Sequence, residues 1–337
     1  MSSPTGPASG LPVRMPRPRQ SGQPGQPGRH RRPGPAAAPL GVPPLVLAVP
    51  GTPDGGTRSL AEEVVSIARS ELPGLDAQIG YVDGDGEEFP QLEAMLTRAA
   101  QERPERLRQA EDAARAAAEA TAALVAEAEA AGEVVEEVPP APTVAHDAPA
   151  AVVVPLLAGP DNATLRRIRQ AVMGSGSAAE LTGVLGPHPL LAEALHVRLS
   201  EAGLARADRA RLFTVATAAD GIILATVGGG EATQAAGITG MLLSARLAVP
   251  VMAAALDEDG AVVRVAEQLR SAGSARLALA PYLIGPEVSP GLTAAAAEEA
   301  GCATAEALGA YPAVGKLALA KYAEALGIPL QASPAMR

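Results

Sequence analysis

The chain has 337 residues, enough for about two domains of ordinary size, and 47% of them are hydrophobic. Aromatic residues make up only 2%, which argues against single-stranded nucleic-acid binding, because such binding stacks bases on aromatic side chains. The formal net charge of −10 and an isoelectric point near 5.0 argue against a binder of polyanions.

Cysteine content and hydropathy indicate the compartment. One cysteine, Cys302, excludes an internal disulfide and a thiolate metal cluster and fits a reducing environment. The longest apolar run, about 237–256, carries Arg246 and Pro250 and is expected to divide into a helix and a strand. The N-terminus has no apolar core of a signal peptide. We therefore expect a cytoplasmic chain without a membrane partner.

The first 42 residues consist largely of Pro, Gly, Gln, Ser and Ala and contain no acidic residue. Their positive charge comes from six arginines: Arg14, Arg17, Arg19, Arg29, Arg31 and Arg32. So little apolar surface does not offset chain entropy, and the sequence predicts a disordered basic tail over 1–42.

A second unusual stretch runs from about 98 to 147. Its first part, 101–131, is rich in Ala, Glu and Arg and predicts a solvated helix. An acidic, proline-rich linker follows over 133–149. We expect this stretch to be an insertion that leaves the surface, with a protein partner as the alternative role.

The rest of the chain contains an internal repeat, which is its most informative feature. An apolar strand ending in a glycine turn occurs at 45–51 and again at 222–228, and a helical pattern follows each, at 59–70 and 231–246. A second strand then ends on an acid, Asp83 in the first half and Asp257 in the second.

The later parts of the two halves match most closely. The third strands and their turns are V-V-V-P-L-L-A-G-P-D (152–161) and A-L-A-P-Y-L-I-G-P-E (278–287). G-P-H-P-L (186–190) and G-A-Y-P-A (309–313) each open a helix, with a proline suited to the first turn.

Both halves therefore carry the same βαβαβα order. Continuous apolar strands alternating with helices predict parallel sheets covered on both faces. We expect an α/β fold of two similar, doubly wound lobes related by pseudo-twofold symmetry. The expected divisions are a tail (1–42), an N-terminal lobe (43–214) with the insertion 98–147, and a C-terminal lobe (215–330).

Residues that end the strands point toward the cleft that two such lobes would enclose. Candidate residues at these positions are Gly51, Asp83, Asp161, Gly228, Asp257 and Glu287, with His188 at a later helix start. Carboxylates bind divalent metals and accept protons, but acids after strands also cap helices and turns. Both interpretations remain open for each acid, and a capping role remains open for His188.

Two other sites are weaker. Gly228-Gly229-Gly230 between a strand and a helix favours a phosphate cradle, but Thr233 stands where a dinucleotide fingerprint needs glycine. No G-x-S-x-G elbow is present, and Cys302 has no evident base.

The order of these motifs in the two halves resembles that of the class II tetrapyrrole chelatases of the sirohydrochlorin chelatase type. The motifs are the strand–glycine turn, the strand that ends on an acid, V-V-V-P-L, and G-P-H-P-L-L-A-E-A-L. The resemblance covers about 44–96 and 150–330. It implies a lyase that inserts Fe²⁺ or Co²⁺ into sirohydrochlorin for sirohaem or cobalamin synthesis, with no cofactor beyond the substrate metal.

The family's usual histidines are absent. The position of the first, in the strand–glycine turn, holds Pro50, and the second falls near 161–163. The resemblance then makes Asp161 and Glu287 the candidate metal ligands and His188 and Asp83 the candidate catalytic groups. Candidate substrate-binding residues are Gly51, Gly228, Arg58 and Arg166, the arginines opposite the carboxylates of sirohydrochlorin. The alternative is a catalytically degenerate relative that binds a tetrapyrrole or a protein.

Overall fold

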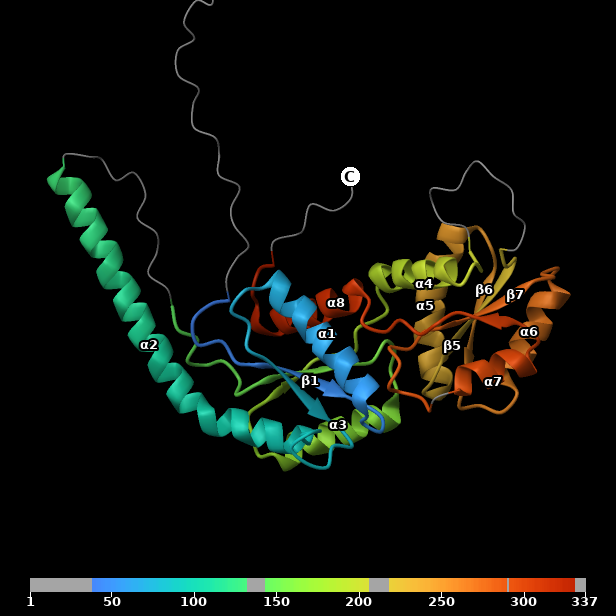
Figure 1. The fold of residues 1–337 in the computed structure, drawn as a ribbon, viewed down its shortest axis with the longest axis horizontal. Coiled ribbons are helices and arrows are strands. Elements are labelled where there is room, and N and C mark those ends of the chain that lie inside the picture. Colours follow the sequence, from blue (N-terminus) through green and yellow to red (C-terminus); the bar gives the residue numbers. More distant parts are fainter. Residues whose placement is uncertain (1–37, 132–142, 206–217, 290, 331–337) are drawn as a thin grey trace, which may run out of the picture. The chain divides into compact units, whose positions relative to one another are not determined.

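A computed structural model describes residues 38–131, 143–205, 218–289 and 291–330 (Figure 1). The first half contains β1 (Leu45–Val49), α1 (Gly55–Glu71), β2 (Ala77–Tyr81), α2 (Leu92–Ala130), β3 (Val152–Pro155), α3 (Asn162–Gly174), β4 (Glu180–Leu181) and α4 (Pro189–Glu201). The second half contains β5 (Gly221–Thr226), α5 (Gly229–Leu247), β6 (Val251–Ala255), α6 (Ala261–Ser271), β7 (Leu277–Pro281), α7 (Leu292–Glu299), β8 (Ala303–Thr304) and α8 (Pro312–Leu326).

Two four-stranded sheets share one topology. The strand orders are β2-β1-β3-β4 and β6-β5-β7-β8, and every pairing is parallel. Even the register repeats, since Leu45 pairs with Val152 in the first sheet and Ile222 with Ala278 in the second. The expected class, two similar doubly wound α/β lobes, is confirmed.

The apolar residues form three clusters because each sheet buries both faces. One outer cluster packs β1 and β3 against α2 and α3, and another packs β5 and β7 against α6 and α7. The third and largest cluster continues from the remaining face of the first sheet to that of the second. Its members include Leu47, Tyr282 and Tyr322, all of which are fully buried. The described part of both lobes is thus held by a shared core.

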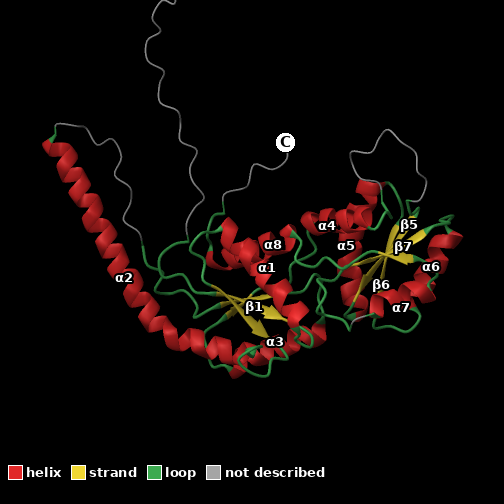
Figure 2. Cartoon of the chain, in the orientation of Figure 1, coloured by secondary structure: helices red, strands yellow, loops and turns green. Residues whose placement is uncertain are grey.

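The last helix of each lobe crosses to the other. Helix α4 follows the first sheet in sequence but packs on α5 and β7, while α8 follows the second sheet and packs on α1 and β3. Figures 1 and 2 show this exchange, with α8 beside α1 and α4 beside α5. Both helices start with a proline in the first turn, as the sequence predicts.

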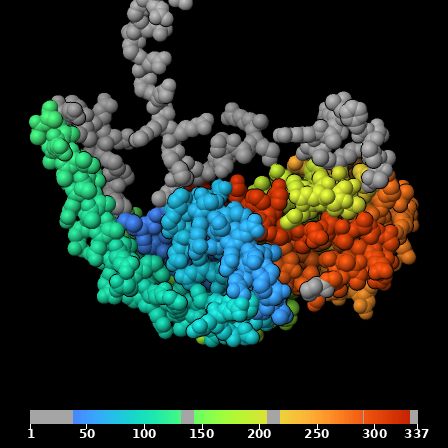
Figure 3. All heavy atoms as spheres, in the orientation of Figure 1, coloured from blue at the N-terminus to red at the C-terminus, as the bar shows by residue number. Residues whose placement is uncertain are grey.

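The helix expected over 101–131 lies within α2, which starts earlier, at Leu92. Its first part buries Leu92, Leu96 and Ala99 against the sheet, and Ala110 is its last buried residue. The remainder is a narrow solvated column, seen in green in Figure 3. Most of the predicted linker and nearly all of the basic tail lie outside the described residues.

Hydropathy along the described helices gives no membrane span: none of them is both long enough and apolar enough to cross a bilayer.

Candidate functional site at the facing switch points

In a doubly wound sheet the ligand crevice lies at the carboxyl ends of the strands where the strand order reverses. In the first lobe this switch point lies between β1 and β3, followed by the turns at Gly51 and Pro160. In the second it lies between β5 and β7, followed by the turns at Gly228 and Pro286. Gly51 and Asp161 follow the strands at the first switch point, and Gly228 and Glu287 follow those at the second, whereas Asp83 and Asp257 follow β2 and β6.

The two switch points touch each other reciprocally. A side chain at Gly51 would overlap the main-chain carbonyl of Pro286, and one at Gly228 would lie 2.5 Å from the carbonyl oxygen of Pro160. Both glycines also have positive φ, +80° and +109°, a conformation that side chains disfavour. Only glycine fits these turns, because each lobe's glycine turn is pressed against the other lobe's Gly-Pro-acid turn.

Glu287 is the best-placed carboxylate at this junction. Its Oε1 accepts from the amide of Ile284 at 2.8 Å, and its Oε2 accepts from the amide of Gly285 at 2.6 Å. The amide of Ala158, three residues after the end of the first lobe's β3 strand, also acts on this carboxylate. Burial raises the pKa of Glu287, and hydrogen bonds from four backbone amides, those of Ile284, Gly285, Ala158 and Glu287 itself, oppose that shift. A carboxylate with a raised pKa accepts a proton more readily than an ordinary carboxylate.

Asp161, the counterpart of Glu287, caps a helix. It is the N-cap of α3, where Oδ1 accepts from the amide of Ala163 at 3.0 Å and Oδ2 accepts from the hydroxyl of Thr164. Its main chain lies against Gly228 of the second lobe. A carboxylate has about four acceptor positions, so the capping bonds of Asp161 leave acceptor capacity on both oxygens.

The acids that end the second strands are held by their own lobes. Asp83 pairs with the guanidinium of Arg167 on α3. Asp257 accepts from the amides of Gly228 at 3.1 Å and Gly229 at 3.4 Å. These two contacts argue against a phosphate cradle at 228–230, because the amides that would bind a phosphate already donate to the carboxylate of Asp257.

His188 is the N-cap of α4. Its Nδ1 accepts from the amide of Leu190 at 3.1 Å, so the neutral ring carries its proton on Nε2. Burial, together with the positive charge of Lys321, lowers the pKa of His188. The imidazole is therefore neutral at pH 7, but its one lone pair is used by the cap. To bind a metal or accept a proton, His188 would have to release Leu190.

The two candidate arginines differ in their surroundings. Arg58, in α1, pairs with Glu88 and lies over the ring of Phe89 at 5.0 Å from the centroid. Arg166, in α3, donates through Nε to the carbonyl of Asn162 at 3.2 Å and is exposed. Both guanidinium groups could contact carboxylates of a large anionic ligand, and Arg166 is the more available of the two because it forms no ion pair with an acidic residue in the described part of the chain.

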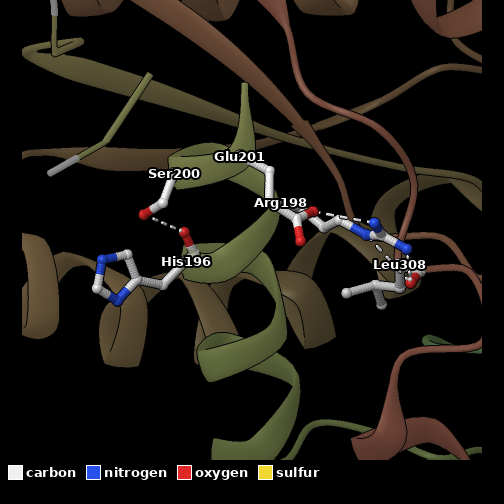
Figure 4. A network of polar contacts seen from close by, with 5 residues as sticks. All are labelled: His196, Arg198, Ser200, Glu201 and Leu308. Carbon is white, nitrogen blue, oxygen red and sulfur yellow. Dashed lines mark hydrogen bonds and ion pairs between the residues drawn. The ribbon is translucent and has the colours of Figure 1, made fainter. Parts of the chain in front are cut away.

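Sequence reasoning missed the contacts that tie the exchanged helices together. Arg198 on α4 donates to the carbonyl of Leu308, just before α8, from Nη2 at 2.9 Å and from Nε at 3.3 Å, and it pairs with Glu201 at 3.0 Å (Figure 4). His196, two residues earlier on α4, is buried and accepts from Arg246 of α5 at 2.7 Å. No sequence signal reveals these pairs, since the partners are 50 and 110 residues apart.

The described residues include no group of three or more His, Cys, Asp or Glu side chains arranged to hold a metal ion.

No family model matches the sequence, and no curated protein does. Among solved structures the chain is similar to one described as CbiX, the terminal enzyme for biosynthesis of siroheme in denitrifying bacteria, with 15% identity, 86% of this chain and 100% of that chain covered, and a TM-score of 0.47. A periplasmic ribose ABC transporter from Conexibacter woesei shows 14% identity, 90% coverage of each chain and a TM-score of 0.30. The strand order and register of the two sheets establish the fold class of this chain.

Proposed function

We propose that this protein is a sirohydrochlorin chelatase-type lyase, which inserts Fe²⁺ or Co²⁺ into sirohydrochlorin between its two lobes for sirohaem or cobalamin synthesis. The sequence resemblance suggests this chemistry. The observation in this chain that supports metal insertion is the partly buried carboxylate of Glu287, which lies where the two switch points meet.

Metal insertion replaces two pyrrole N–H protons by one divalent ion, so the site needs a proton acceptor and a group that holds the ion. Glu287 suits the first role because burial raises its pKa, which makes it a better proton acceptor than an ordinary carboxylate. Asp161 suits the second because its capping bonds leave acceptor positions on a hard oxygen ligand. Arg58 and Arg166 are proposed to bind carboxylates at the rim of the macrocycle.

A second candidate function is binding of the tetrapyrrole without metal insertion. It is favoured by the bonds that hold the other expected catalytic groups: the lone pair of His188 caps α4, and Asp83 pairs with Arg167. A protein of this kind would hold or deliver the macrocycle.

Anaerobic absorbance spectroscopy of the purified chain with sirohydrochlorin and Co²⁺ or Fe²⁺ separates the two functions. Conversion to the metallated spectrum faster than in a protein-free control supports the lyase. A shifted spectrum of the bound, unmetallated macrocycle supports the second candidate. An unchanged spectrum with every ion rejects both.

Two variants locate the chemistry. Glu287→Gln keeps the size of the side chain and removes the proton acceptor, and it should slow insertion while the macrocycle still binds. Glu299→Gln, on the exposed end of α7, is the matched control and should insert metal at the wild-type rate.

A further inference from the structure

The outer face of α5 is apolar where a solvated helix would carry charge. Between Glu231 and Arg246 the helix contains no charged residue. Its outer face consists of Gln234, Ile238, Met241, Leu242 and Ala245. Met241 is 66% exposed, Ile238 45% and Leu242 40%. Three large apolar side chains at i, i+3 and i+4 form one continuous stripe.

The duplicated fold supplies an internal comparison. Helices α1 and α5 bury their inner faces in the same register, since Ala61, Val64, Val65 and Ala68 correspond to Ala236, Thr239, Gly240 and Leu243. The same offset places the exposed Glu63 and Ser66 of α1 at the positions of Ile238 and Met241. Two positions of this face are thus polar in the first lobe and apolar in the second, while the third, Leu242, corresponds to the apolar Ile67. The fold alone does not require an apolar outer face here.

The α5 outer face is complementary to itself when two copies pack antiparallel. A twofold axis near Thr239 sets Met241 of one helix opposite Gly237 of the other. Met241 is the most exposed side chain of the face, and a Cβ built on Gly237 meets no atom within 4 Å. A protruding residue therefore faces an open position on the partner helix, and the reverse contact follows from the symmetry.

The charged residues at the two ends of α5 also match in this antiparallel arrangement. With the axis near Thr239, Glu231 of one copy lies within one residue of Arg246 of the other. Glu231 is in the first turn of α5, where it accepts from the side-chain amide of Asn162 at 2.7 Å, and Arg246 is in the last turn, where its Nε donates to His196 at 2.7 Å; both residues are also exposed to solvent. An antiparallel pair thus brings opposite charges together at both ends, and it also opposes the two helix dipoles.

We propose that the α5 outer face is a homodimer interface, in which α5 of one protomer packs antiparallel on α5 of a second copy of this chain. Shape and charge match about a single twofold axis, so the partner needs no surface beyond those that the chain itself provides.

The test is the molar mass of the full chain in solution by analytical ultracentrifugation over a wide concentration range. The proposal predicts a reversible dimer of twice the 33.8 kDa chain mass. Met241→Glu should raise the dissociation constant by about a hundredfold or more, because each copy would bury an unpaired carboxylate against Gly237 of the other. The matched control is Ser66→Glu at the equivalent exposed position of α1, which should leave the dimer unchanged.

A charge exchange tests the register. Glu231→Arg and Arg246→Glu should each weaken the dimer, and the double variant should recover most of the loss. Circular dichroism of each variant checks that it is folded. A chain that stays monomeric at every concentration overturns the proposal, as does a dimer that Met241→Glu leaves intact or a double variant weaker than both single ones.

Discussion

Replacing Gly51 by alanine tests the contact between the lobes at its tightest point. The new Cβ would overlap the carbonyl of Pro286, which belongs to the backbone of the opposite lobe and cannot rotate away. The residue would also keep a φ of +80°, which costs about 1–2 kcal/mol for a residue with a side chain. Relieving the overlap requires a backbone shift of the kind that costs about 1–3 kcal/mol.

Together these terms predict that Gly51→Ala lowers the free energy of unfolding by about 2–5 kcal/mol. Gly55, four residues later at the start of α1, is the matched control, because a Cβ there meets no atom within 4 Å. Gly55→Ala should be neutral or stabilise by up to about 1 kcal/mol. Equilibrium unfolding in guanidinium chloride measures both variants. Equal midpoints for the two would refute the close approach of the lobes at Gly51.

Two further predictions concern the exchanged helices. The pKa of His188 is lower in the folded state, so its contribution to stability is complete above the unfolded value of about 6.5 and is lost as pH falls through the folded value. Thermal melts should show this loss in wild type and not in His188→Asn, whose amide oxygen caps α4 without titrating. Identical pH profiles for the two proteins would contradict a contribution of the His188 cap to stability. Arg198→Met keeps much of the aliphatic part of the side chain and removes the charged donors from the carbonyl of Leu308, which should lower the free energy of unfolding in urea by about 1.5–3 kcal/mol. The control is Arg264→Met, on the exposed side of α6. An equal or smaller loss of stability in Arg198→Met than in this control would contradict a tie between the exchanged helices.

Much of the fold could be predicted from the sequence because the signals were local and occurred twice. The strand at 45–49 and its repeat at 221–226 are continuous apolar runs, and both are buried at every position. Pro189 and Pro312 mark helix starts because proline fits the first turn, whose amides have no partner within the helix. The helix that the sequence predicts over 101–131 lies within α2, whose first part belongs to the repeat and packs on the sheet.

The exchange of α4 and α8 could not be predicted in this way. A helix with an apolar face can pack on either sheet, and nothing local in 189–201 selects the second lobe. The tie between Arg198 and Leu308 joins residues 110 positions apart, so it too depends on the assembled lobes.

The candidate acids show a subtler limit. Asp161 and Glu287 end matching turns, yet a helix begins directly after Asp161, whereas α7 begins only at Leu292. Asp161 therefore caps a helix, while the longer side chain of Glu287 folds back on its own turn at the lobe junction. Symmetry in the sequence placed both acids at the sheet edges, but it did not indicate that their environments differ.

The initial rate of cobalt insertion into sirohydrochlorin, measured anaerobically with saturating macrocycle for wild type and Glu287→Gln, tests whether Glu287 is the proton acceptor of a metal-inserting site. We expect a wild-type rate above the protein-free control and a loss of about a hundredfold or more in the variant, the usual contribution of a positioned general base. We also expect the variant to bind the macrocycle with an unchanged dissociation constant. Equal insertion rates in wild type and Glu287→Gln would contradict the role of this carboxylate.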